Sequence, residues 1–389
     1  MSISSAREHL KQCKDEFKLS SNFNSEEFRI VANGFFQAKG HVSCRIRGKY
    51  FSPVFAINQK FSAKSIEFFL TLWLVLGRTG TLSINKNKHG NLVIRLSSEN
   101  WETILNIYSK YFNNTYGEKY IAFQKLSDIR RLTSNDLNLY SSSIALATHI
   151  VYDLSADGVS RKLSLSDQLK LLGLKSTNVE LPIYTDNFIT PSILFIIGFI
   201  LGDGTLHLRL RKSDKDSIWL IPTLFLYQLK NKYNAHFFSM LENFFKSLNI
   251  KTYTINKANN SEIVNIFTSN ELNIKEMTIL TVESISSIFK ILLPVIRPYS
   301  HYLYWKYDQY ELMSRVARLV NAKAHYTLYG FINLIDIIYS YPNKRHQSKQ
   351  IFLEVIKTWF KARASETKSG ENNIQAVYGR GTLKGSIIA

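Results

Sequence analysis

The apolar positions of this chain follow two different periods, and the places where the period changes mark its elements. From residue 25 into residue 38 they recur every three or four residues, which predicts a helix that ends at Gly40. On either side of Gly48, segments 41–47 and 50–59 alternate in character, which predicts a β-hairpin. The pattern then predicts a helix at 62–76, a second hairpin from 81–84 and 92–97, and a helix at 101–112.

The start of the first helix carries its own signal. Asn24 with Glu27 three residues later has the form of a capping box, in which the asparagine accepts backbone amides and the glutamate reaches back. Residues 1–23 are polar and rich in Ser and Lys, with an amphipathic stretch at 6–17. We interpret them as an adaptable lead-in to the folded part.

The same order of elements returns from residue 190. Thr190 is placed to cap a helix with Pro191 at its first position, and the glycines within 202–204 close it. The pattern then predicts strands at 205–211 and 219–228, a helix at 236–248, and a hairpin of 252–256 with 263–269. We infer an internal duplication.

Matching segments support the duplication. Ile84-Asn85-Lys86 returns as Ile255-Asn256-Lys257, 171 residues later, and 92–98 matches 263–269 at that offset. Gly34 and Gly198 stand 164 residues apart and Gln59 and Gln228 stand 169 apart, so the second half carries roughly five extra residues around 212–217. The predicted organisation is a lead-in (1–24), a first half (25–180), a second half (181–365) and a C-terminal tail (366–389).

Composition narrows the class of partner. The 389 residues include 49 Lys and Arg against 30 Asp and Glu, so a formal charge of +19 is spread along the chain. This surplus predicts a broad surface for nucleic acid, ahead of a membrane surface, because no basic amphipathic helix stands apart from the folded pattern. With 45% hydrophobic residues the chain has enough apolar surface to bury full cores.

The sequence carries no sign of a secreted or membrane protein. Cys13 and Cys44 are too few and too far apart for a disulfide framework or a zinc site, and we expect free thiols. The longest apolar stretch, Ile193–Leu201, is about half the length of a membrane span. The amino terminus lacks the apolar block of a secretory signal, so we expect a soluble, intracellular protein.

The two duplicated helices contain related nonapeptides. Ala-Asn-Gly-Phe-Phe-Gln-Ala-Lys-Gly at 32–40 and Ile-Ile-Gly-Phe-Ile-Leu-Gly-Asp-Gly at 196–204 both resemble the motif that names the LAGLIDADG homing endonuclease and intron maturase family, in its two-motif, single-chain form. The resemblance covers roughly residues 25–365. It implies an α+β fold of two αββαββα halves, with the two motif helices in close contact and each sheet forming half of a DNA-binding saddle. Small residues on the helix contact face suit that packing. They are Gly34, Ala38, Gly198 and Gly202.

The resemblance also implies a metal site at the ends of these helices. The acidic residue at the eighth motif position is Asp203, which would hold Mg²⁺ with the backbone carbonyl of Gly202 and promote hydrolysis of a phosphodiester by an in-line water. Lys39 occupies the matching position of the first motif, and a cation cannot ligate a metal. Three consequences are open: Lys39 occupies one cation position, only one strand is cut, or cleavage is lost.

Other residues match the family's supporting positions. Gln59 and Gln228 resemble the polar residues that position solvent near the metal, although hydrogen bonding to DNA or backbone explains them equally well. Lys119, in Gly-Glu-Lys-Tyr-Ile-Ala-Phe, resembles the basic residue that polarises the attacked phosphate. His301 stands at the corresponding place in the second half, where an ordinary polar role is the stronger alternative.

The predicted DNA-contacting residues lie on the strands. Alternate side chains of an antiparallel strand in the major groove reach base edges and phosphates. For any one of them, a solvated strand side chain is an equal alternative. The candidates are Arg45, Arg47, Lys86, Lys88, Arg95, His207, Arg209, Arg211 and Lys257.

We therefore predict an intron-encoded, site-specific endonuclease that acts as a monomer on a long asymmetric double-stranded DNA target. The main alternative is a maturase that assists splicing of a group I intron RNA, since RNA binding does not need both carboxylates. A third is a decayed endonuclease or repressor that only binds DNA. The residues favoured in this chain have AT-rich codons, so we expect mitochondria ahead of chloroplasts.

Overall fold

The computed structural model describes residues 1–48, 50–134, 141–154, 162–174, 179–212, 218–229, 234–257, 277–340 and 348–368, the side chains of 229, 256–257 and 362–368 excepted. The chain divides into two compact units, 1–203 with 231–241, and 204–230 with 242–389. No helix of the described ranges combines the length and the apolar character needed to span a membrane.

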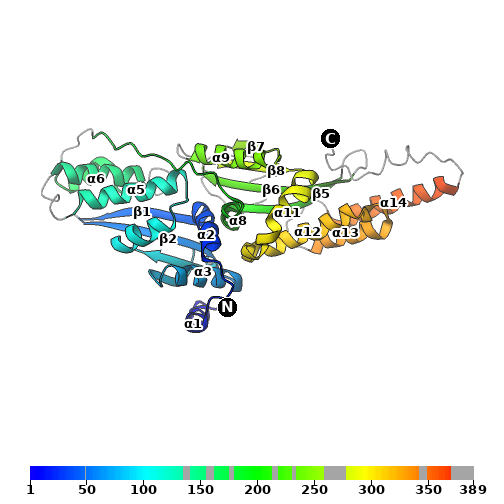
Figure 1. The fold of residues 1–389 in the computed structure, drawn as a ribbon, viewed down its shortest axis with the longest axis horizontal. Helices are drawn as coiled ribbons and strands as arrows, with labels where there is room; N and C mark the ends of the chain where they lie inside the picture. Colours follow the sequence, from blue (N-terminus) through cyan, green and yellow to red (C-terminus); the bar gives the residue numbers. More distant parts are fainter. Residues whose placement is uncertain are drawn as a thin grey trace. The chain divides into compact units, whose positions relative to one another are not determined.

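The first unit starts with a helix and then follows the predicted element order (Figure 1). Asn24 caps the second helix by accepting from the backbone amides of Glu26 and Glu27, and Gly40 ends it, as the sequence predicts. The elements are α1 (Ile3–Glu16), α2 (Ser25–Lys39), β1 (Gly40–Arg47), β2 (Tyr50–Lys60), α3 (Ala63–Val75), β3 (Thr81–Lys86), β4 (Leu92–Ser98), η1 (Thr103–Tyr108), α4 (Ser109–Tyr111), α5 (Gly117–Leu132), α6 (Ser141–Leu154), α7 (Leu165–Leu171) and α8 (Ile193–Asp203).

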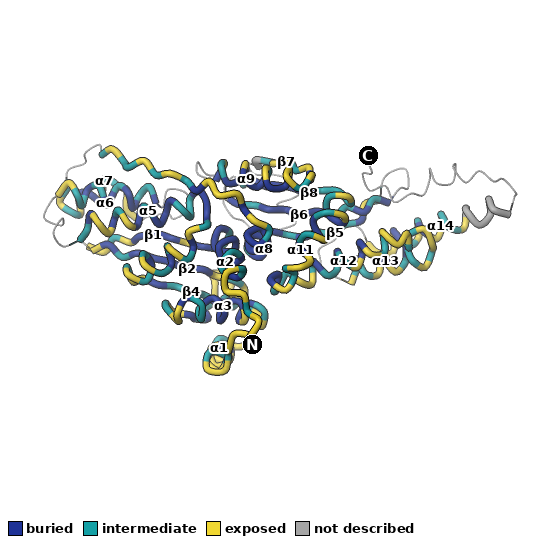
Figure 2. Tube along the Cα trace, viewed as in Figure 1, coloured by how far each residue is buried: buried dark blue, intermediate teal, exposed yellow. Residues whose placement is uncertain are grey.

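The strands of this unit form an antiparallel sheet in the order β1-β2-β4-β3, here called sheet 1. Residues that share one face through the register, among them Phe55, Ile57 and Leu96, are fully buried. The buried colour runs along much of β2 in Figure 2. Phe36 of α2 stacks on Phe55 with ring centroids 5.1 Å apart, so the motif helix packs on this face. The opposite, polar face of sheet 1 carries the side chains of His41, Ser43, Arg45, Arg47, Asn58 and Arg95.

The lead-in is more ordered than the sequence predicts, because α1 is anchored to the edge of sheet 1. Arg7 donates to the carbonyl of Ile84 at 3.0 Å, and Lys14 donates to that of Leu82 at 2.8 Å. Both carbonyls belong to β3, an edge strand whose outward groups have no neighbouring strand. Long basic side chains thus hold α1 against this edge.

The second unit repeats the arrangement with its own antiparallel sheet, sheet 2, in the order β5-β6-β8-β7. The equivalent strands occupy equivalent positions in the two sheets, which confirms the duplicated α+β fold. The strands and helices that follow α8 are β5 (Gly204–Lys212), β6 (Ile218–Leu229), α9 (Asn234–Ser247), β7 (Tyr253–Lys257), β8 (Met277–Glu283), η2 (Ser286–Leu292), α11 (Leu293–Ile296), η3 (Arg297–Lys306), α12 (Tyr307–Asn321), η4 (Ala324–Tyr326), α13 (Leu328–Ser340) and α14 (Lys349–Lys368).

Two boundaries in the second half differ from the prediction. Ser192, rather than Thr190, caps α8, since its side chain and carbonyl accept from Phe195 and Ile196, and α8 runs through Asp203. The strand that pairs with β7 is Met277–Glu283, whereas the predicted partner 263–269 lies outside the described residues. The five central residues of 277–283 are buried, which suits a strand that lies between β6 and β7 in sheet 2.

The two sheets agree residue by residue. Gly40 pairs with Ile57 in sheet 1, and Gly204 pairs with Leu226 in sheet 2. Pro53 and Pro222 occupy the same position, on the second strand, where neither has a recorded partner in the fourth. A proline there removes no interior hydrogen bond, so the shared position reflects a shared architecture.

Candidate active site and nucleic-acid interface

The site begins where α2 and α8 lie side by side in the first unit (Figure 1). A Cβ on Gly34 would overlap the carbonyl oxygen of Phe195, and a Cβ on Gly198 would overlap that of Val31. At Gly202 a Cβ would collide with the Cβ of Ala38. The small residues of both nonapeptides therefore permit backbone contact along the crossing, as the motif resemblance implies.

The close crossing brings Lys39 and Asp203 together at the carboxyl ends of the two helices. The Lys39 ammonium donates to Oδ1 of Asp203, and their side chains are 35% and 14% exposed. The sequence identified Lys39 as a departure from the acidic pattern but gave no indication that it binds the remaining carboxylate. The pair therefore combines one carboxylate, a group type that can ligate a metal, with one internal cation.

The side chains fit one divalent cation and not two. Asp203 offers a carboxylate, whereas the ammonium opposite is a donor without a lone pair. Across the described parts of the chain no three His, Cys, Asp or Glu side chains form a metal-binding group. A cation at this site would therefore depend on Asp203, the backbone and oxygens from a ligand.

Gln59 and Lys119 lie at the same end of sheet 1 as this pair. Gly40, which follows Lys39, pairs with Ile57, so Gln59 is two residues beyond that pairing. Lys119 is in the first turn of α5 with a side chain 12% exposed, 3.6 Å from the Glu118 carboxylate. The structure thus gathers the first half's predicted catalytic residues around the end of α2.

His41 marks the electrostatic character of this region. His41 is an exposed residue of β1, and its Nε2 lies 3.0 Å from the hydroxyl of Ser43. The surrounding protein lowers the pKa of His41, and the positive charges of Lys119, Arg95 and Arg45 lower it further. Basic residues of β1, β4 and α5 thus concentrate positive charge around His41, which follows the end of α2.

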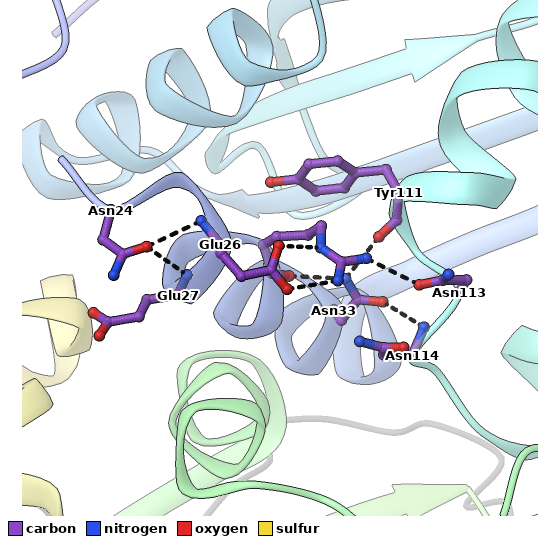
Figure 3. Close-up of polar contacts among 8 residues, drawn as sticks. Asn24, Glu26, Glu27, Asn33, Tyr111, Asn113 and Asn114 are labelled. Atoms are coloured by element: carbon purple, nitrogen blue, oxygen red, sulfur yellow. Dashed lines mark hydrogen bonds and ion pairs between the residues drawn. The ribbon is translucent and has the colours of Figure 1, made fainter. Parts of the chain in front are cut away.

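A buried polar cluster positions the loop that leads to Lys119 (Figure 3). Asn33 of α2, fully buried, donates to the carbonyls of Arg29 and Tyr111 at 2.8 Å and accepts from the amide of Asn114 at 3.0 Å. Arg29 in turn forms an ion pair with Glu26. Because Asn33 belongs to the first nonapeptide, the motif helix directly orders the loop before α5.

The next turn of α2 continues this support. The Gln37 side-chain oxygen accepts from the amide of Tyr116 at 2.8 Å, and Asp186 accepts from the amide of Gly117 at 2.6 Å. The Tyr116 hydroxyl donates to Ile189, and burial raises its pKa above the usual range. Sequence patterns missed these positioning residues, although two polar residues on the buried face of an apolar helix are a recognisable signal.

The second unit contains the remaining catalytic candidates. Gln228 is buried in β6, two residues beyond Leu226, the partner of Gly204, and so matches Gln59. His301 is an exposed residue of η3, with its ring 4.0 Å from that of Tyr302. The fold therefore repeats the glutamine position, whereas the role of His301 stays a prediction.

The predicted nucleic-acid residues gather mainly on the polar faces of the sheets. Arg45, Arg47 and Arg95 share that face of sheet 1. The polar face of sheet 2, which carries Thr205, His207, Arg209, Arg211, Thr281 and Glu283, follows the same alternation. Lys86, at the end of β3, and Lys88, beyond it, are exposed. By register, Lys86 belongs to the face opposite the polar one. The Lys257 side chain is not among those described.

Two acidic residues that the sequence analysis missed lie on these faces. Arg45 contacts Glu99 at 2.7 Å, and Arg209 contacts Glu283 at 3.3 Å. Glu283 also accepts from the Tyr253 hydroxyl at 2.6 Å. The sequence did not predict a strand at 277–283. The equivalence of Glu99 and Glu283, which ends β8, was therefore not apparent from the sequence.

Comparison with known proteins agrees with this geometry. Residues 32–130 match the family described as LAGLIDADG endonuclease. No curated protein matches the sequence. Among solved structures, I-SmaMI bound to an uncleaved DNA target with calcium ions is 18% identical, with a TM-score of 0.59, covering 84% of this chain and all of that one. I-LtrWI bound to target DNA is 16% identical, with a TM-score of 0.60, covering 83% and 100% of the two chains. The first half of this chain thus carries the LAGLIDADG endonuclease signature, and the protein has the fold of the single-chain LAGLIDADG homing endonucleases.

Proposed function

We propose that this protein is a site-specific endonuclease that binds double-stranded DNA and hydrolyses a phosphodiester bond in one strand. The observation that carries the proposal is the Lys39–Asp203 pair at the ends of the crossed motif helices. It leaves one carboxylate where the family places two, next to a sheet with an arginine-bearing polar face. DNA-bound structures of the same fold support duplex DNA as the ligand.

Different residues of the chain would have different roles in such a reaction. Mg²⁺, the cofactor we propose, would activate the attacking water and neutralise the leaving oxygen. Asp203 would hold this cation, and Lys39 fixes the carboxylate while adding a positive charge of its own. Lys119 supplies an ammonium for the attacked phosphate, and Gln59 offers donors and an acceptor for solvent.

A maturase is the second candidate function. The ammonium of Lys39 favours it, because an RNA-binding scaffold needs neither carboxylate. Binding to group I intron RNA would use the same basic surface, to which the formal charge of +19 is suited. Intron homing is an expectation of the endonuclease proposal, and a mitochondrial location is expected with either function.

The test starts from DNA selected out of a randomised duplex library and cloned into a supercoiled plasmid. With Mg²⁺ we expect nicked product, no linear product, and no cutting in chelator. Asp203→Asn should abolish nicking and keep DNA affinity. Nicking that survives Asp203→Asn would refute the site assignment, and linear product would refute the restriction to one strand.

Binding separates the two candidate functions. The full chain is titrated with the selected duplex and with a structured group I intron RNA at the same salt concentration, since affinity for either polyanion depends steeply on salt. The endonuclease proposal predicts preference for the duplex. Tight RNA binding with no DNA cleavage would favour the maturase instead.

A further inference from the structure

The Arg45–Glu99 and Arg209–Glu283 pairs are the same feature formed twice. Arg45 and Arg209 stand at the same position of β1 and β5, because Gly40 and Gly204 open those strands five residues earlier. Glu283 pairs with Thr223 of β6, and Glu99 follows Ser98, whose partner Phe55 matches Leu224. Each glutamate therefore reaches its arginine across the second strand.

Charge argues against a simple phosphate contact at these two positions. Phosphate oxygens attract a cation and repel a carboxylate, so a glutamate beside the arginine weakens non-specific attraction to the DNA backbone. Arg47 and Arg211, two residues further along each strand, have no recorded ion pair among the described residues. Within the described residues, the duplicated carboxylate thus accompanies the inner arginine of each strand.

The pairs also leave donors available. Nη1 of Arg45 and Nη2 of Arg209 contact the carboxylates, and among the described residues no recorded hydrogen bond uses the other Nη of either guanidinium. The arginine side chains are 45% and 43% exposed, so the guanidinium edges reach the surface. A guanidinium held on one side by a carboxylate presents its other donors in a fixed direction.

We propose that these pairs are two equivalent base-recognising units, in which Glu99 and Glu283 orient Arg45 and Arg209 toward a guanine in the major groove. O6 and N7 of guanine are the two acceptors that a guanidinium fork matches. Each sheet would then specify one G·C base pair. The inference rests on the proposed function, since it requires duplex DNA as the ligand.

The test is the base preference of the full chain, measured by selection from randomised duplexes in chelator, so that no cleavage is needed. Arg45→Ala should erase a guanine preference at one position, with a loss of discrimination of about tenfold or more, and Arg209→Ala should erase another. Arg47→Ala and Arg211→Ala are the matched controls. They should weaken binding of all sequences alike.

The glutamates need a readout that a merely structural role would not change. Glu99→Ala should broaden the preference at the Arg45 position only, while Glu99→Gln, whose amide oxygen still accepts from arginine, should keep most of it. Equal melting temperatures would show that both variants fold. If Arg45→Ala weakens all sequences uniformly, the inference fails while duplex binding stands. If wild-type protein does not prefer duplex DNA, the proposed function fails with it.

Discussion

Lys39 is a residue at which the two halves differ sharply in chemistry. Its counterpart 164 residues later is Asp203, so one motif ends in a cation and the other in an anion, and the close helix crossing turns this asymmetry into an ion pair. In the absence of Lys39, a second carboxylate at the same place would create like-charge repulsion that a divalent cation relieves.

Lys39→Asp should therefore replace the ion pair with a metal site that has two carboxylates. Thermal unfolding of this variant should shift upward on adding Ca²⁺, because a ligand bound only by the folded state stabilises it. The wild type should shift much less. Lys39→Met, which removes the cation without adding a ligand, is the control, and an equal Ca²⁺ response in Met and Asp variants would count against the interpretation.

Lys125 is a second residue whose partner decides its role. Its side chain is 2% exposed, contacts the Asp153 carboxylate at 2.6 Å, and lies 5.6 Å from the centre of the Tyr184 ring. The pair joins α5, which carries Lys119, to α6.

Lys125→Met should lower the free energy of unfolding by about 3 kcal/mol, because it leaves the Asp153 charge partly buried without its ammonium. Adding Asp153→Leu should recover much of the loss, since an apolar pair has no uncompensated charge. Chemical denaturation measures both. Equal stability of the single variant and wild type would show that the carboxylate moves to solvent at little cost.

His41 predicts how stability depends on pH. Its pKa is below the ordinary value in the folded state, first through burial and then through Lys119, Arg95 and Arg45, with Glu118 opposing them. The unfolded chain therefore takes up a proton before the folded one as pH falls, and the free energy of unfolding decreases below about pH 6.5.

His41→Gln should flatten this part of the profile, measured by urea unfolding between pH 7.5 and 5.5. His89→Gln, in the exposed turn that follows β3, is the control for loss of a surface histidine. A profile of His41→Gln that coincides with wild type would contradict the assignment.

At the scale of elements, the crossing of α2 and α8 is a contact that leaves no room for an added atom. A Cβ at Gly198 meets backbone of α2 rather than a flexible side-chain end, so neither helix can yield locally. The aromatic residues around the crossing, including Phe35 and Phe195, are fully buried and limit any larger shift.

Gly198→Ala should lower the free energy of unfolding by at least about 2 kcal/mol, against the gain in helix propensity that alanine brings. Gly48→Asn is the matched control, because Gly48 has open space around its Cβ position and a positive φ that asparagine tolerates. Denaturant unfolding compares them. A Gly198→Ala protein as stable as wild type would mean that the helices can separate without cost.

At the scale of the whole molecule, one chain carries two sheets of identical strand order. If both sheets bind DNA, as we propose, a single chain would need no partner copy of the kind that dimeric recognition of DNA requires. The halves also differ at matched positions, such as Ser43 against His207, so the target need not be palindromic.

One chain should therefore bind one duplex. Light scattering after size-exclusion chromatography should give a monomer without DNA and a 1:1 complex with the selected duplex. A 2:1 complex at the same site, or a dimer in the absence of DNA, would contradict this expectation.

The sequence by itself determined the order of elements, the duplication and the motif helices. These depend on local signals, such as the Asn24 cap, the end at Gly40 and the alternation along β1 and β5, which act over a few residues. The same locality explains the errors. The strand that pairs with β7, 277–283, was not predicted, because its place in sheet 2 depends on burial and long-range contacts, and the predicted partner 263–269 lies outside the described residues.

Only the tertiary structure decided which charges meet. Lys39 and Asp203 are 164 residues apart, Arg45 and Glu99 are 54 apart, and Arg209 and Glu283 are 74 apart. Asn33 and Gln37 likewise hold a loop about 80 residues away. Such partners are chosen by helix crossing and strand register, because electrostatic and hydrogen-bond energies depend on distances in space, and spacing along the chain does not contain them.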